Sequence, residues 1–127
     1  MIRIYGIREK LGPIRSKLSD VINECIVEAL SYPDNKRAHR FIPLGREDFY
    51  FPEGRSDAYT VIEINMMEGR SVEARKRLIK LLFGRIELTV GVDPMDVEIT
   101  ISESPASNWG FRGMTGDEAD LDYKVEV

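Results

Sequence analysis

The chain has little of several residue types that particular functions require. Of its 127 residues, one is a cysteine and one is a histidine. A single cysteine, Cys25, cannot form a disulfide within the chain, and its place among helically spaced apolar residues predicts a buried, unreactive thiol. A single histidine, His39, excludes a metal site built from several histidines, and the acidic residues show no metal-loop spacing. We therefore expect no metal and no cofactor.

An excess of positive charge and long apolar runs are also missing. The formal net charge is -4, which argues against nucleic acid as a partner because binding phosphates requires a basic face. No apolar run approaches the length of a membrane span, and residues 1–6 are too short and too interrupted for a signal peptide. We therefore expect a cytoplasmic protein that binds neither nucleic acid nor membrane, folded as a single domain over residues 1–127.

The chain contains the same sequence of predicted secondary-structure elements twice. Alternating and helically spaced apolar residues predict strand, helix, strand, strand, helix and strand over residues 2–6, 13–30, 39–44, 59–66, 72–90 and 97–102. The second set follows the first at a constant offset, from Ile4 to Ile62 (62 − 4 = 58) and from His39 to Val97 (97 − 39 = 58). We therefore predict an α/β (α+β) fold with β-α-β-β-α-β order, in which two parallel β-α-β units form a four-stranded sheet with both helices on one face.

The predicted sheet leaves one face without a helix. That face would carry Tyr5, Tyr59, Val61 and either Phe41 or Ile42. Because parallel sheets rarely leave a face in water, we expect copies of the chain to cover it in a closed homo-oligomer. A last short strand is predicted over residues 122–127.

Arg70 is the first candidate for a functional residue. It lies between Gly69 and Ser71, where a predicted strand ends and a helix begins. Helix N-termini attract anions, and a guanidinium can bind a carboxylate through two hydrogen bonds. The site would therefore suit a small carboxylate, although a surface arginine in a turn is the alternative.

Two further groups could complete such a site. Trp109 and Phe111 lie in a glycine-bounded loop after Pro105, where they either wall a ligand pocket or fill a subunit contact. A basic cluster is formed by Lys36, Arg37, His39 and Arg40. It is either a solvated turn or a source of positive charge for an anion site.

Two segments carry a resemblance to a known family. Glu68–Ser71 (EGRS) and Ser104–Phe111 (SPASNWGF), together with the two β-α-β units, resemble the tautomerase superfamily, in the branch that contains malonate semialdehyde decarboxylase and a subgroup of uncharacterised bacterial proteins. The resemblance implies a trimer whose sites lie near subunit contacts and bind small carboxylates or 2-keto acids. By position, Arg70 matches the residue that holds the substrate carboxylate, and Trp109 and Phe111 match the aromatic wall.

The chain also departs from that family. The family uses an amino-terminal proline as acid or base, whereas the second residue here is Ile2, so the candidate catalytic group is the primary amine of Met1 or Ile2, with an ordinary pKa of roughly 7.7–8.0. Lys36 or one of its neighbours stands where the family has an aspartate, and Glu68 where it has a second arginine. Two functions stay open: a weak keto–enol isomerase that does not use proline, and a non-catalytic ligand-binding or interaction module on the same trimeric scaffold. A purely structural oligomer, in which the aromatic loop only packs, is the third alternative.

Overall fold

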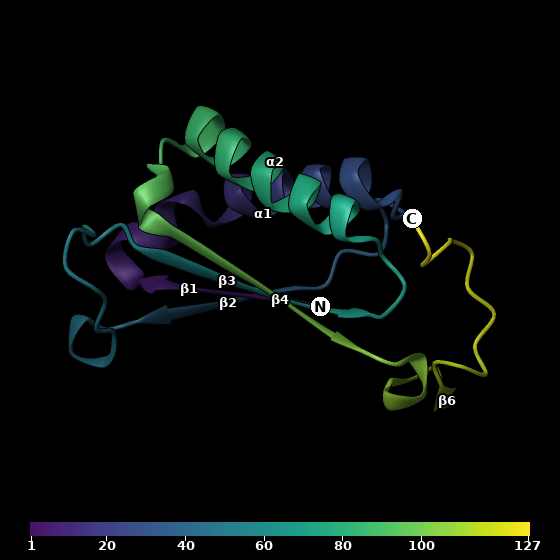
Figure 1. Ribbon diagram of the computed structural model, residues 1–127. Coiled ribbons are helices and arrows are strands. Elements are labelled where there is room, and N and C mark those ends of the chain that lie inside the picture. Colours follow the sequence, from purple (N-terminus) through teal and green to yellow (C-terminus); the bar gives the residue numbers. More distant parts are fainter.

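A four-stranded sheet covered on one face by two helices forms the body of the computed structural model, which describes residues 1–127 (Figure 1). The main elements are β1 (Ile2–Ile7), α1 (Arg8–Leu30), β2 (His39–Leu44), β3 (Thr60–Met67), α2 (Val72–Val90) and β4 (Val97–Ser104). Two short strands, β5 (Gly110–Phe111) and β6 (Met114–Thr115), form a separate hairpin. Single 3₁₀ turns follow β2 (η1, Arg46–Asp48), precede β4 (η2, Pro94–Asp96) and follow it (η3, Ala106–Asn108).

The strand order of the sheet is β2-β1-β3-β4. β1 pairs with β2, and β3 with β4, in parallel, whereas the two central strands β1 and β3 are antiparallel. β1 and β3 begin 58 residues apart (60 − 2), as do β2 and β4 (97 − 39). The predicted β-α-β-β-α-β architecture with both helices on one face is therefore confirmed.

The core lies between the sheet and the two helices. Every second strand residue points towards the helices, and Ile4 and Ile62, which are register partners, are 0% exposed. α2 begins where predicted, because the Ser71 hydroxyl accepts a hydrogen bond from the backbone N–H of Ala74 at 3.1 Å. It ends at Gly91, whose positive φ of 73° suits the left-handed cap.

The predicted start of the first helix at Pro13 is wrong. α1 begins at Arg8, and its apolar stripe extends back to Leu11, which is 1% exposed. Pro13 therefore lies in the second turn, where its missing N–H removes one helical hydrogen bond. The polar residues 8–10 hid this first turn, and the preference of proline for the first helical position set the boundary too late.

The strand predicted over residues 122–127 is also wrong. No strand pairs with this segment, which is irregular, and its last carbonyl, on Val127, accepts a hydrogen bond from the backbone N–H of Ser71 at 2.9 Å. The missed hairpin β5–β6 turns at Arg112 and Gly113, which both have positive φ. The tail returns to the end of the sheet where the chain starts (Figure 1).

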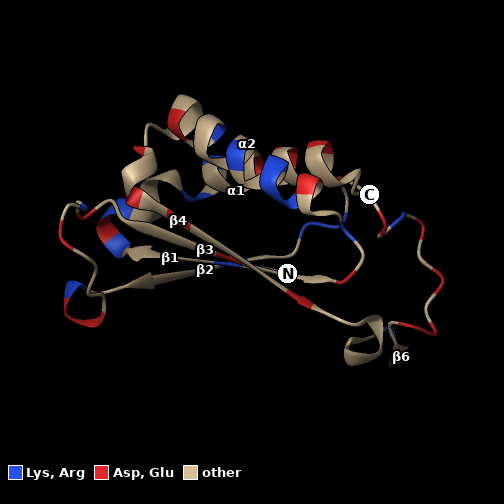
Figure 2. Cartoon of the chain, viewed as in Figure 1, with Lys and Arg blue, Asp and Glu red and all other residues tan.

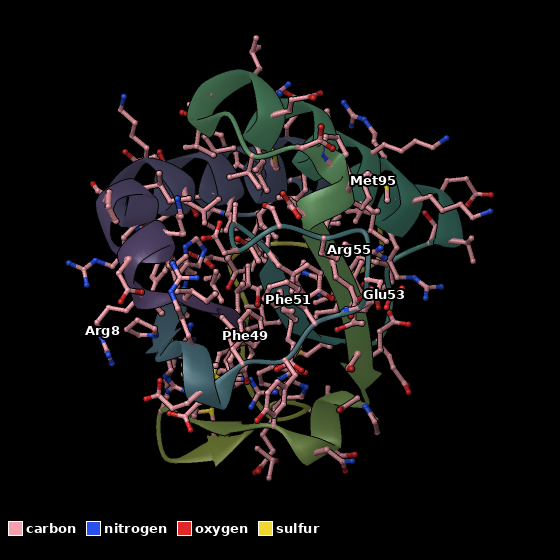
Figure 3. All side chains as sticks on the ribbon, turned by 90° about the vertical axis from the view of Figure 1, so that its left-hand side faces the viewer. Arg8, Phe49, Phe51, Glu53, Arg55 and Met95 are labelled. Carbon is pink, nitrogen blue, oxygen red and sulfur yellow. The ribbon has the colours of Figure 1, made fainter.

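Part of the second sheet face is covered by the chain itself. Tyr59 is 4% exposed, and its ring lies 5.7 Å from that of Phe49 and 5.6 Å from that of Phe51. Figure 3 shows both phenylalanines lying centrally at this end of the molecule, with Arg8 and Glu53 at the margins. The prediction that Tyr59 lies on a bare face is therefore wrong, because the segment between β2 and β3 packs over it.

The rest of that face has no covering element within the chain. Ile42 is the register partner of Tyr5, and Phe41 is the partner of the buried Ile4. Ile42 therefore shares this face with Tyr5, whereas Phe41 packs against the core. The structure contains no helix with both the length and the apolar character needed to cross a bilayer.

Candidate functional site

A cavity of about 420 Å³ lies where the start of β1, the end of β3, the β5–β6 hairpin and the tail meet. Its lining includes every residue proposed for the site: Met1, Ile2, Arg37, His39, Arg40, Arg70, Trp109 and Phe111. Residues separated by more than 100 positions in the sequence thus face one space. Their part in binding stays a prediction.

Arg70 is the buried cation of this cavity. It follows Gly69 and directly precedes the N-cap of α2, and it is 7% exposed. One of its Nη atoms donates to the Met67 carbonyl at 3.3 Å, its Nε has no partner, and no carboxylate lies within ion-pair distance. Burial lowers the pKa of Arg70, although an arginine stays charged at any workable pH. Its charge is therefore available to an anion in the cavity.

The C-terminal tail packs against the turn that carries Arg70. Gly69 has a φ of 137°, and a side chain there would meet Val125 Cγ1 at 2.9 Å. Further along the tail, the Tyr123 ring stands edge-on to Tyr32, with centroids 4.7 Å apart, and both rings line the cavity. These tyrosines could not be identified from the sequence, because both lie in irregular segments without periodicity.

The charge of the lining is one-sided. Among the 22 residues around the cavity no Asp or Glu occurs, while five are Lys or Arg: Lys36, Arg37, Arg40, Arg70 and Arg112. The chain as a whole carries a net charge of -4, so positive charge is concentrated here. Figure 2 shows the segment that leads from α1 into β2 in blue, whereas red recurs along the tail. The electrostatics favour an anionic ligand.

Two of these five cations are already paired. Arg37 Nη1 lies 2.7 Å from Asp20 Oδ1, and Lys36 Nζ lies 3.3 Å from Asp122 Oδ1. Arg112 lies over the Phe111 ring at 5.4 Å from its centroid. Arg112 was not singled out from the sequence, although it follows Phe111 directly. The carboxylates of Asp122 and Asp20 partly cancel the charges of Lys36 and Arg37, so Arg40, Arg70 and Arg112 are the cations of the lining without a carboxylate partner.

His39 is neutral in this environment. Its Nδ1 lies 2.8 Å from the Ser19 hydroxyl. Burial, together with the positive charges of Arg37 and the chain's amino group, lowers the pKa of His39 to about 4. Contrary to the expectation that the histidine could add charge, it contributes none to the site near pH 7.

The amino group of Met1 faces the same cavity. It donates a hydrogen bond to the Asn65 carbonyl at 2.9 Å, and the Asn65 N–H donates to the Met1 carbonyl at 2.8 Å. Burial lowers the pKa of this amine, and the charges of Arg70, Arg40 and Arg3 lower it further. More of the amine is therefore unprotonated near neutral pH than in an exposed chain start, so it can accept a proton.

Trp109 and Phe111 contribute an aromatic wall to the cavity. Both are half-buried, and the Trp109 carbonyl accepts a hydrogen bond from the Gly116 N–H at 2.7 Å, which closes the hairpin. The indole Nε1 is buried without a partner. An apolar wall facing a few polar anchors is the usual composition of a small-molecule site.

Comparisons with known proteins agree with this architecture. Residues 36–112 match the sequence model of the family described as tautomerase enzyme. The chain is 25% identical over 100 residues to the probable tautomerase YusQ of Bacillus subtilis, covering 75% of this chain and 79% of that protein. It is 34% identical over 56 residues to the 2-hydroxymuconate tautomerase of Comamonas testosteroni, covering 44% and 89%.

Solved structures share the fold. A crystal structure of malonate semialdehyde decarboxylase superposes with a TM-score of 0.81 at 22% identity, covering 90% of this chain and 92% of that one. Native fused 4-OT superposes with a TM-score of 0.80 at 17% identity, covering 91% and 95%. With the family match extending over more than half of its residues, the chain belongs to the tautomerase family.

Proposed function

We propose that the cavity binds a small carboxylate or 2-keto acid and that Arg70 holds the carboxylate. The observation that carries this proposal is a guanidinium only 7% exposed, without an anionic partner, in a lining that contains no Asp or Glu. A buried charge without a partner costs several kcal/mol. A carboxylate can accept two parallel hydrogen bonds from a guanidinium. An anionic ligand would therefore supply the charge partner that Arg70 lacks in the folded chain.

The reaction that we propose is a weak keto–enol isomerisation that does not use proline. Such a reaction moves a proton between a carbon and the oxygen of the neighbouring carbonyl group, so it needs a group that accepts and returns a proton. The Met1 amine, with its lowered pKa, can perform this step beside Arg70. The 2-hydroxymuconate tautomerase among the relatives is named for a reaction of this class.

Binding without turnover is the second candidate. Ile2 stands where the resembled family has its catalytic proline, and the amine already donates a hydrogen bond to the Asn65 carbonyl. A primary amine held in this way has a different geometry and nucleophilicity from a secondary ring amine. The cavity would then act as a ligand sensor or interaction module.

Arg70→Met, compared with the unmutated protein, tests the carboxylate site that both candidates share. We expect phenylpyruvate to raise the melting temperature of the unmutated protein, and the ligand affinity to fall by at least about tenfold in Arg70→Met, since a hydrogen bond to a charged group contributes about 1.5–3 kcal/mol. Arg15→Met is the matched control, because Arg15 is exposed and lies outside this cavity.

Turnover is followed by the conversion of phenylenolpyruvate to its keto form. Ligand binding with turnover that depends on Arg70 supports the isomerase. Binding without turnover supports the second candidate. A melting temperature that does not respond to phenylpyruvate, or an equal response in Arg70→Met, contradicts both.

We also propose that the chain assembles as a homotrimer. Fused 4-OT structures that share its fold are described as trimers, and Tyr5, Ile42 and Val61 lie half-buried on the part of the second sheet face that no element of the chain covers. Sedimentation equilibrium should give a mass of three chains. A monomer at micromolar concentration would contradict this assembly.

A further inference from the structure

The paired tyrosines Tyr32 and Tyr123 are the part of the cavity that the proposed function does not use. Their rings meet edge-on at 66° with centroids 4.7 Å apart. Tyr32 follows the end of α1, and Tyr123 comes from the tail. The two segments are also joined by the ion pair between Lys36 and Asp122.

Both tyrosines share the cavity with Arg70, because all three residues belong to its lining. The tail is fixed beside Arg70 by the hydrogen bond from the Ser71 N–H to the Val127 carbonyl. A ligand carboxylate held by Arg70 would therefore place its neighbouring atoms beside the tyrosine pair.

Their hydroxyls can donate to that ligand. Both tyrosines line the cavity together with Arg70, and each phenol carries one O–H that can be donated to an acceptor. Burial and the neighbouring Tyr123 raise the pKa of Tyr32 to about 12, so its phenol keeps its proton at neutral pH.

Other polar groups of the lining are less suited to this role. His39 is bonded to Ser19, and the Asn23 amide donates to the Asp34 carbonyl at 3.3 Å. The neutral donors left in the lining are the tyrosine hydroxyls, the Asn65 amide and the Trp109 indole. Of these, Tyr123 lies in the tail that is bonded to the residue after Arg70.

We propose that the Tyr32–Tyr123 pair makes the cavity select 2-keto acids over plain carboxylates, by donating an O–H hydrogen bond to the 2-oxo oxygen while Arg70 holds the carboxylate. This inference rests on the proposed function of the cavity. A site that provides a donor for a ligand oxygen discriminates against the analogue that lacks the oxygen, because the donor is then left unpaired.

The test compares the affinities of 2-oxobutyrate and butyrate, which differ by one oxo group, by isothermal titration calorimetry. We expect the unmutated protein to bind 2-oxobutyrate about fivefold more tightly, the factor that corresponds to one net hydrogen bond. In the double variant Tyr32→Phe/Tyr123→Phe the two affinities should become equal, with butyrate affinity unchanged within about twofold, because both rings and their contact remain. The single variants show which hydroxyl donates, and Tyr50→Phe, at a tyrosine that is 90% exposed, is the control.

The outcomes separate this inference from the proposed function. Arg70→Met should weaken both ligands alike. If both acids bind through Arg70 with equal affinity, or if the double variant keeps the preference, the tyrosine inference is wrong and the carboxylate site stands. If neither acid binds the unmutated protein, both are wrong.

Discussion

His39 should make the stability of this protein fall in mildly acidic solution. Its pKa is lowered from 6.5 to about 4 in the folded protein, chiefly by burial. As the pH falls below 6.5, the unfolded chain binds a proton at this residue and the folded chain does not, so protonation favours unfolding. The loss grows as the pH falls and becomes constant below about pH 4.

The two pKa values set the size of the effect. Between pH 7 and pH 5 they correspond to a loss of about 2 kcal/mol in the free energy of unfolding. Urea unfolding at the two pH values measures it, and His39→Asn is the control because an amide keeps a partner for the Ser19 hydroxyl without titrating. The variant shares every other titration, so the difference between the two proteins belongs to His39. An equal loss of stability in both proteins would refute the reasoning.

Two further substitutions test contacts that hold the loops, one beside the cavity and one away from it. Gly69→Ala should destabilise the fold by about 1–3 kcal/mol and weaken phenylpyruvate binding. The reason is that a φ of 137° is strained for any residue with a side chain and that the new methyl group meets Val125. Unchanged binding in titration calorimetry would show that the tail does not position Arg70. Ser56→Ala should lower the free energy of unfolding, measured with urea, by about 1.5–3 kcal/mol without changing ligand affinity. The Ser56 hydroxyl donates a hydrogen bond to the buried Asp96 carboxylate at 2.6 Å, which the variant loses. A change below about 0.5 kcal/mol would contradict this role.

The regular elements could be predicted because their signals are local. The offset of 58 residues appears in the starts of the strands, and Ser71 and Gly91 mark the ends of α2 by their capping chemistry. Arg70 could be found because a cation beside a helix N-terminus is unusual in the sequence itself. The start of α1 was missed because Pro13 gives a strong local signal that tertiary packing of Leu11 overrides.

The closing parts of the site could not be predicted in the same way. Tyr123 reaches the cavity because Val127 bonds to Ser71 and Val125 fits against Gly69. These are long-range contacts between irregular segments, which have no period or motif. Likewise Phe49 and Phe51 cover Tyr59 only because the loop folds back, so aromatic content alone did not reveal which sheet face they would protect.

The stability of the empty protein shows whether Arg70 serves the fold or a ligand. The guanidinium is buried, its Nε is unpaired, and it stands at the positive end of α2, where a cation is unfavourable. Methionine removes the charge and fills similar space. We therefore expect Arg70→Met without ligand to be more stable than the unmutated protein by about 1–3 kcal/mol, although its affinity for phenylpyruvate falls by at least about tenfold. Urea unfolding measures the change, with Arg15→Met as control.

A variant that is more stable without ligand but binds the ligand more weakly is expected if Arg70 serves binding rather than the fold. In that case the ligand supplies the partner that the guanidinium lacks, and it stabilises the unmutated protein more than the variant. A residue that supports the fold gives the opposite sign. If Arg70→Met is less stable than the unmutated protein, the hydrogen bond to Met67 and the packing of the guanidinium outweigh the burial of its charge. The carboxylate site would then lose its main physical support.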